Sequence, residues 1–227
     1  MSNHIHKFGR NPDIDTGVTE TVWEGGGLYT FLDVEETISI VSDDANDTSD
    51  GTGLRQLTVQ GLNDSYNEIS ETVTLNGTTP VVTETKFLRV FRAFGVSAGS
   101  TGTNEGNIVG TSSSSSNTLF QVSADLGQTQ LTIYTVPLGK VLEITSVDVT
   151  TFKQSAGAYE VRLMVRLFGC AWRLFGTFGA SGGGNLVKSY YPPLSIAEKS
   201  DIRMDAIVGA NNTAVAASFS GFLRDIT

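Results

Sequence analysis

The stretch AYEVRLMVRLF, from Ala158 to Phe168, decides the fold class of this chain. Apolar side chains stand at every second position from Tyr159 to Leu167, and the positions between them hold charged residues or methionine. Successive side chains of a β-strand point to opposite faces of a sheet, so the pattern predicts a half-buried antiparallel strand. The same alternation recurs at 202–208 and at 215–223. No segment has a helical period, and we therefore expect an all-β fold.

Turn and bulge signals add detail to this expectation. Asn76-Gly77 stands between Thr72–Leu75 and Pro80–Val82, and it is the type of dipeptide that closes a tight hairpin, because both positions tolerate positive φ. We expect a hairpin there. In residues 141–149 the apolar positions change parity, which predicts a β-bulge near Ser146.

The serine run TSSSSSN at 111–117 predicts a flexible link, because small polar residues give a chain that resists packing. Several strands at regular spacing after it predict that the carboxyl-terminal domain is an antiparallel β-sandwich of the jelly-roll-like type. The expected organisation is an extended amino-terminal arm at 1–17, a smaller β region at 18–110, a linker at 111–118 and the sandwich at 119–227.

Composition and charge exclude several classes of partner. Charged residues make up 17% of the chain, and no apolar run approaches the roughly 20 residues of a membrane-spanning helix. The amino end lacks the apolar stretch of a signal peptide, so we expect neither export nor a membrane partner. Residues 1–85 carry a net charge of −12 and residues 86–227 a net charge of +3. A nucleic-acid binder needs a basic surface, so the acidic half suits solvent or a basic protein instead.

The sequence offers little for catalysis. His4 and His6 are the only histidines, so residues 7–227 cannot form a Ser/His/Asp or Cys/His arrangement. Cys170 is the only cysteine, so no internal disulfide forms, and its apolar neighbours predict a small buried side chain rather than a nucleophile. The carboxylate pairs Glu35-Glu36 and Asp201 with Asp205 resemble a glycosidase acid and base, but charges on an exposed strand are usually solvated. We therefore expect that the protein is not an enzyme and binds no cofactor.

One segment is rich in the oxygen ligands that calcium prefers. The candidate ligands are Asp43, Asp44, Asn46, Asp47 and Asp50. The segment lacks the glycine and the bidentate glutamate of an EF-hand. An acidic surface loop with Asx turns is therefore the expected structure, and calcium binding is the alternative.

Two groups of apolar residues are candidates for a partner interface. Ile5 and Phe8 are the apolar anchors of the amino-terminal segment, which we expect to lie on a neighbouring subunit. The second group is Phe168, Trp172 and Phe175, with arginines interleaved. Such aromatics form a core and a subunit interface, or alternatively a platform on which sugar rings stack.

Two motifs resemble segments of accessory structural proteins in tailed-bacteriophage particles. Residues 70–81, SETVTLNGTTPV, precede a Phe/Arg-rich strand at 87–94 and a Gly/Asn-rich turn, and this order is similar to that of the family. Residues 134–140, YTVPLGK, resemble a strand entry found in phage structural β-sandwiches.

The resemblance implies a capsid decoration or cement protein that assembles in the host cytoplasm. It implies a place on the virion head surface, with the major capsid protein and further copies of the chain, as a homotrimer, for partners. The alternative is a head or tail fibre subunit that recognises host surface glycans.

Overall fold

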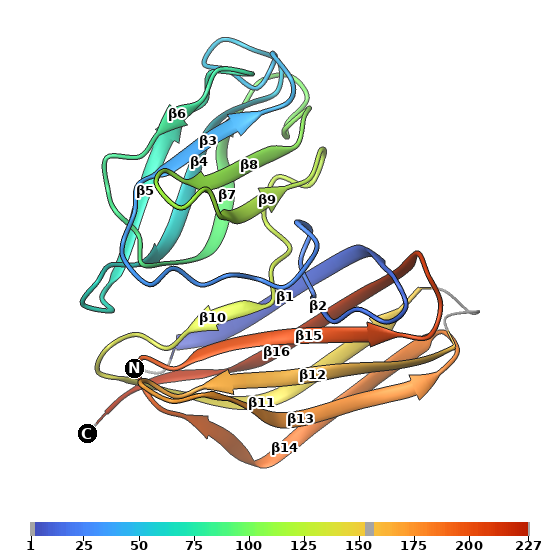
Figure 1. Ribbon diagram of the computed structural model, residues 1–227. Helices are drawn as coiled ribbons and strands as arrows, with labels where there is room; N and C mark the ends of the chain where they lie inside the picture. Colours follow the sequence, from blue (N-terminus) through green and yellow to red (C-terminus); the bar gives the residue numbers. More distant parts are fainter. Residues whose placement is uncertain (1–2, 153–156, 227) are drawn as a thin grey trace. The chain divides into compact units, whose positions relative to one another are not determined.

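The computed structural model describes residues 3–152 and 157–226 and is drawn in Figure 1. Within those residues the fold is all-β and contains no helix, as expected. The strands form several antiparallel sheets in two compact units. Unit 1 comprises Met1–Tyr29 with Leu131–Thr227, and unit 2 comprises Thr30–Gln130. Unit 2 is therefore a continuous segment inserted into the sequence of unit 1.

Unit 1 contains two sheets, which Figure 1 shows as two layers. The first sheet has the order β1 (Asn3–Ile14), β16 (Thr213–Asp225), β11 (Lys140–Thr151) and β14 (Gly184–Ile196). The second has the order β10 (Ile133–Thr135), β15 (Asp201–Val208), β12 (Ala158–Arg166) and β13 (Trp172–Ser181), with β2 (Glu20–Thr21) also beside β15.

The strand pairs of unit 1 are nested. The outermost pair is β1 with β16, followed inward by β10 with β15, β11 with β14 and β12 with β13. Successive pairs alternate between the two sheets. The chain of unit 1 therefore has the topology of one long hairpin, closed at the turn between β12 and β13 and wound so that its pairs fall into two sheets.

The alternation read from the sequence is confirmed in the core of unit 1. Tyr159, Val161, Leu163 and Val165 of β12 are all buried. The inward residues of β15 and β16 follow the same rule and are Ile202, Met204, Ala206, Val208, Val215, Ala217, Phe219, Gly221 and Leu223. Each large aliphatic or aromatic side chain buried in this way contributes roughly 1.5 to 3 kcal/mol to folding. The predicted bulge is confirmed too, because the pairing of β11 shifts between Ile144 and Ser146.

Unit 2 has two smaller sheets around a single core. One has the order β6 (Val81–Val82), β3 (Ile38–Ser42), β8 (Ile108–Ser112) and β9 (Thr118–Val122). The other has the order β5 (Glu68–Thr74), β4 (Leu54–Leu62) and β7 (Arg89–Ala98). The core draws residues from both sheets, including Ile38, Leu57, Phe87 and Phe120, which are fully buried.

The expected hairpin at Asn76-Gly77 is wrong. A turn does form there, with Gly77 at a φ of 58° and the Thr79 amide bonded to the Asn76 carbonyl at 3.1 Å. The strands on its two sides do not pair, because β5 pairs with β4 and β6 pairs with β3. The turn therefore carries the chain from one sheet of unit 2 to the other.

The serine linker predicted at 111–118 is also wrong. Ser112 ends β8, and the following residues form the turn into β9 of the same sheet. The carboxylate of Glu36 accepts hydrogen bonds from the amides of Ser114 at 2.6 Å and Ser115 at 3.0 Å. The run is thus an ordered hairpin inside unit 2, and the chain passes between the units near residues 30 and 130 instead.

Of the amino-terminal arm predicted at 1–17, residues 3–14 form a strand of this chain's own sheet, and residues 1–2 lie outside the described residues. β1 pairs with β16 along its length, with Phe8 opposite Ser218. Its buried positions include Lys7, Gly9 and Asn11, so the apolar alternation that identifies other strands is missing here. Gly9 is required because a Cβ there would overlap the backbone of Val22.

Net charge divides between the units. Unit 2 contains thirteen acidic and four basic residues, whereas unit 1 contains eleven of each. The whole net charge of −9 therefore belongs to unit 2.

Candidate interaction surface

Strands β13 and β14 are edge strands of the two different sheets of unit 1. Among the described strands, β13 pairs only with β12 and β14 pairs only with β11, so each has one unpaired edge. The two strands are consecutive in the chain and contact each other. We call residues 167–199 the edge flank; it comprises the turn before β13, both strands and the turn after β14.

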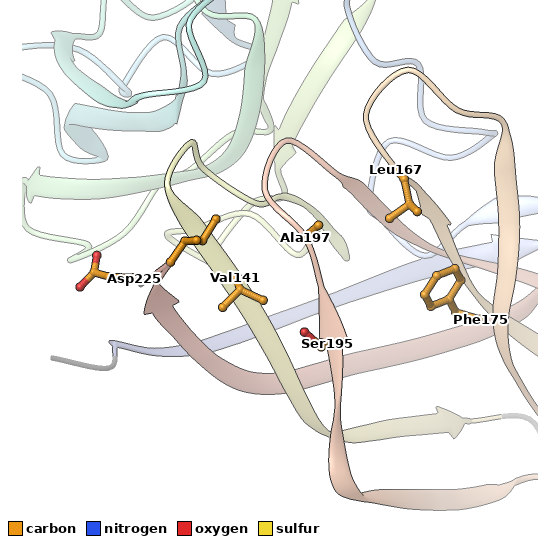
Figure 2. Close-up of a pocket in the computed structure, with 7 residues that line it drawn as sticks. Val141, Leu167, Phe175, Ser195, Ala197 and Asp225 are labelled. Carbon is orange, nitrogen blue, oxygen red and sulfur yellow. The ribbon is translucent and has the colours of Figure 1, made fainter.

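A bulge in β13 shapes the edge flank. Leu163 of β12 faces Gly176, and Met164 faces Leu174, so Phe175 is the extra residue. Phe175 lines an open groove of about 530 Å³, shown in Figure 2. The other lining residues come from β11, β14, the end of β16 and the adjoining turns, and they are Val141, Leu167, Ser195, Ala197, Asp225 and Ile226. The lining is mostly apolar, so the groove suits an apolar side chain of a partner.

Large apolar side chains are exposed along the edge flank. The exposed fractions are 61% for Phe168, 54% for Leu174, 59% for Val187 and 100% for Tyr191. Scattered exposed apolar residues are normal on protein surfaces, but these four lie on one pair of adjoining strands and the turn before them. Leu174, opposite Met164, lies on the outer face of the second sheet, and Val187, opposite Asp148, lies on the outer face of the first, so the exposed apolar residues occupy more than one face of the flank.

Both edges carry features that oppose the addition of another strand. Arg173 stands opposite the buried Val165, and Lys188 stands opposite the buried Val147, yet both cations are exposed. Charges at inward-facing edge positions discourage edge-to-edge pairing. Pro192 and its neighbour lack amide donors, and the pairing of β14 with β11 skips residues 190–193. A partner is therefore expected to contact side chains rather than extend the sheet.

Tyr190 links the two edge strands. A Cβ added to Gly176 of β13 would lie 3.1 Å from the hydroxyl oxygen of Tyr190, which comes from β14. Burial raises the pKa of Tyr190 above its ordinary value, because the phenolate loses water in this position.

The outer face of the second sheet holds a row of polar contacts at the end of the edge flank. Trp172, Arg166, Asp201 and Thr135 are cross-strand neighbours on β13, β12, β15 and β10. Arg166 Nη2 donates to Asp201 Oδ2 at 2.6 Å, and Thr135 Oγ1 donates to Asp201 Oδ1 at 2.6 Å. The guanidinium carbons of Arg166 and Arg203 lie 5.0 and 4.4 Å from the Trp172 ring centroid. Both guanidinium groups therefore lie within cation–π distance of the indole ring.

The expectation that Asp201 and Asp205 are solvated is wrong. Each is only 3% exposed, and Asp205 pairs with Arg203 at 2.8 Å. The Thr21 hydroxyl donates to Asp205 at 2.8 Å, because β2 lies beside β15. An arginine and a threonine bind each carboxylate. Both carboxylates therefore have structural partners, unlike a glycosidase acid and base, which must reach a substrate.

The aromatic residues that were predicted to cluster lie in three different places. Trp172 lies on the outer face, Phe175 lines the groove, and Phe168 is exposed in the turn with Lys199 Nζ 5.2 Å from its ring centroid. All three belong to the edge flank, but they do not form one cluster. Ile5 and Phe8 are half-buried on β1, where the Phe8 ring stacks on His6 with centroids 5.6 Å apart.

Cys170 differs from its expected burial. It is exposed in the turn between β12 and β13, where its amide bonds to the Leu167 carbonyl at 2.9 Å. Gly169 allows this turn with a φ of 72°. Its neighbours Phe168 and Ala171 are also exposed, and Leu167 and Trp172 are half-buried.

The predicted calcium segment is organised around a buried carboxylate. Asp47 is fully buried, and its Oδ1 accepts the amides of Leu54 at 2.7 Å and Glu105 at 3.0 Å. Its Oδ2 accepts the Ser42 hydroxyl at 2.6 Å and the Gly106 amide at 3.0 Å. Of the other candidates, Asp43 binds Asn107, Asp44 forms an Asx turn with Asn46, and Asp50 is exposed. The described residues contain no group of three His, Cys, Asp or Glu side chains arranged to hold a metal ion.

Sequence reasoning missed the buried polar residues of unit 2. Arg89 is 6% exposed and donates from Nη1 to the carbonyls of Leu32 at 2.7 Å and Leu88 at 2.9 Å. Its guanidinium lies 5.2 Å from the Phe31 ring centroid. Asp47 and Glu36 are the buried carboxylates of the same unit. The local sequence does not separate these buried charges from exposed ones, because Glu36 follows Glu35 and Asp47 stands in an acidic segment.

No helix of the described residues is long and apolar enough to cross a membrane. No protein-family model matches this chain, and no curated protein matches it either. Among solved structures it is similar to chains from infectious bursal disease virus (IBDV). A chain of the T13 IBDV viral particle is 10% identical, covering 97% of this chain and 69% of that one, with a TM-score of 0.23.

Chains of the Gt and Gx strains of the same virus are 9% and 11% identical. They cover 100% of this chain and 77% and 78% of their own, with TM-scores of 0.18 and 0.19. Likenesses with TM-scores this low establish neither a shared fold nor a function.

Proposed function

We propose that this chain is a non-enzymatic structural protein of a tailed-bacteriophage particle, which decorates the outer surface of the head and bridges copies of the major capsid protein. Unit 1 is the jelly-roll sandwich of this proposal. Its support is the nested pairing of β1 with β16 through β12 with β13, alternating between two sheets. Double-sheet jelly rolls of eight strands are common in viral capsid domains.

The observation that carries the proposal is the edge flank. It presents four large exposed apolar side chains, and its residues Leu167 and Phe175 line an apolar groove of about 530 Å³. A surface of this kind is unfavourable in water and is covered when a protein assembles. Its edges disfavour strand addition, so the flank suits a defined contact rather than open-ended aggregation.

The proposed mechanism is adhesion to the assembled shell. A protein that binds only the assembled state stabilises that state by RT ln(1 + [L]/Kd) for each site. Bridging neighbouring capsid subunits would therefore raise the resistance of the shell to heat and to pressure from packaged DNA. No reaction is required of the bound protein.

The experiment compares decorated heads with heads stripped of this protein. We expect stripped heads to release DNA at a lower temperature and to recover when purified protein is added back. Leu174→Asp should abolish the recovery, while Val96→Asp, at an exposed position in unit 2, should preserve it. Equal heat release from decorated and stripped heads would refute the proposal.

Recognition of host glycans is a second candidate, favoured by one observation on unit 2. A hollow of about 300 Å³ is lined by Gln60, Gly61, Glu68, Ile69, Ser70 and Phe91. An aromatic ring together with amide, carboxylate and hydroxyl groups suits a sugar ring. Saturable, sugar-competed adsorption of labelled protein to host cells, lost in Gln60→Ala, would favour this function over cement.

A further inference from the structure

The outer face of the second sheet is buried on one side and open on the other. Thr135 of β10 and Asp201 of β15 are buried, whereas Leu174 of β13 is exposed. The open side therefore lies over β12 and β13. The register places six side chains together on this side, which we call the arginine face: Arg162, Met164, Arg166, Trp172, Leu174 and Arg203.

Cations and apolar groups meet on the arginine face. Met164 has Arg162 and Arg166 two positions away on its own strand, and it has Arg203 and Leu174 opposite it on the two neighbouring strands. Side chains at i and i+2 of a strand point the same way, and directly opposite residues have Cβ atoms about 5 Å apart. Three guanidinium groups therefore surround an apolar centre made by Met164 and Leu174.

The carboxylates that hold two of these arginines lie beneath the surface. Asp201 pairs with Arg166 and Asp205 pairs with Arg203, and these carboxylate side chains are only 4% and 3% exposed. The arginine side chains are 30% and 16% exposed. The buried carboxylates therefore fix the arginines in place, while the cationic ends reach the surface.

Arginine donors remain for a partner. A guanidinium has five N–H donors, and the pairs of Arg162 with Glu160 and of Arg203 with Asp205 both use Nε. Within the described residues, these bonds leave the terminal N–H groups of both arginines for a further acceptor. A carboxylate matches the planar fork of a guanidinium. Two guanidinium groups already lie at the Trp172 ring, which favours a carboxylate over a stacked sugar as the ligand.

We propose that the arginine face binds an acidic segment of a protein partner, in which a carboxylate meets Arg162 and Arg203 and an apolar side chain covers Leu174. The inference rests on the proposed function and deepens it, because it gives the chemistry of the capsid surface that this protein contacts. Trp172 and Leu174 belong to the edge flank, so the contact extends from the flank across β12 to β15.

Binding of purified protein to stripped heads is the first test. Arg162→Met removes a guanidinium from an exposed ion pair and should raise the dissociation constant about tenfold. Leu174→Ser should raise it by a similar factor. Arg224→Met breaks a comparable pair with Glu143 on the first sheet and should leave the constant within about twofold. Arg162→Met protein that is folded by circular dichroism and binds with wild-type affinity overturns the inference.

Chemical modification of the heads tests for the carboxylate. Carbodiimide with glycinamide converts exposed carboxylates of stripped heads to amides before the protein is added. Wild-type protein should then bind about tenfold more weakly, whereas Arg162→Met, which has already lost part of the contact, should lose at most about threefold. Equal losses for the two proteins contradict the inference. Displacement of wild-type protein by free glucuronate, but not by acetate at the same concentration, would assign the face to an acidic glycan instead and overturn it.

These outcomes separate the inference from the proposed function. If wild-type protein protects stripped heads from heat and Arg162→Met protects them equally well, the decoration function stands and only this contact is wrong. If wild-type protein binds no heads, the decoration function fails and the inference that rests on it fails too.

Discussion

The carboxylate of Glu36 accepts the amide of Ser114 at 2.6 Å across 78 residues of chain. Burial disfavours the charged form of Glu36, and the hydrogen bonds from Ser114 and Ser115 outweigh it, so the pKa of Glu36 is lowered from its ordinary value of 4.5. The hydrogen bonds hold the serine hairpin to the segment just before β3, where Glu36 forms an isolated bridge with Phe87. The charge of one residue thus orders a segment whose composition is typical of a linker.

This bond makes the stability of unit 2 dependent on pH. A lowered pKa in the folded state contributes stability that is present above about pH 4.5 and is lost as the pH falls through the folded value. Glu36→Gln should therefore reduce stability at neutral pH and flatten its decline in acid. Urea unfolding at several pH values measures this, with Glu35→Gln as the control. A variant whose acid decline matches the wild type would show that Glu36 is not responsible.

Asp47→Asn should destabilise unit 2. Each oxygen of Asp47 accepts two hydrogen bonds, so the amide nitrogen of asparagine must face at least one backbone N–H donor, whichever way it is turned. The expected loss is about 3 kcal/mol, since buried donors without an acceptor cost about 1 to 3 kcal/mol each. Asp50→Asn, at an exposed position of the same loop, should change stability by less than about 0.5 kcal/mol.

The same loop tests the calcium alternative. Because both oxygens of Asp47 already have partners, we expect the thermal midpoint to be unchanged by calcium or by a chelator. A rise of the midpoint with calcium concentration would restore the metal interpretation.

Arg166→Met should destabilise unit 1 by about 2 to 4 kcal/mol. The substitution leaves the Asp201 carboxylate, whose side chain is 4% exposed, with the Thr135 hydroxyl but without its cation. Arg162→Met is the matched control on the same strand face. Its partner Glu160 is 37% exposed, so the loss should be about 0 to 1 kcal/mol. Equal losses in denaturant unfolding would mean that burial does not distinguish the two pairs.

Tyr190 should make stability fall in alkaline solution. Its pKa is raised in the folded protein, so the unfolded chain ionises first, and stability declines as the pH rises above about 10. Tyr190→Phe should reduce this decline, whereas Tyr191→Phe, at a fully exposed position, should preserve it. Unfolding midpoints at several alkaline pH values decide between the two outcomes.

Periodicity predicted the faces of strands but not their partners. The alternation at 158–166 identified the buried side chains of β12 correctly, because burial on one sheet face requires a period of two. The same rule does not say which strand lies alongside, so the two segments beside Asn76-Gly77 were assigned to one hairpin although they lie in different sheets.

Domain boundaries and the interaction surface depended on contacts that the sequence does not display. β1 belongs to unit 1, although unit 2 lies between it and its partner β16 in the sequence. Lys7, Gly9 and Asn11 occupy its buried positions, so its sequence lacks the apolar alternation that identifies a strand. The aromatic residues Phe168, Trp172 and Phe175 all lie on the edge flank. Its unpaired edges followed only from the order of strands in the two sheets.

The nested pairing also sets an order of events during synthesis. Unit 2 is complete once residue 130 has left the ribosome, and all of its strand partners lie within 101 residues of one another. Asn3 of β1, in contrast, meets Leu223 of β16, so the outermost pair forms only after the last strand has been made. Pairings between such distant segments close slowly. Unit 2 can therefore fold first, before the two segments of unit 1 that flank it in the sequence have paired with each other.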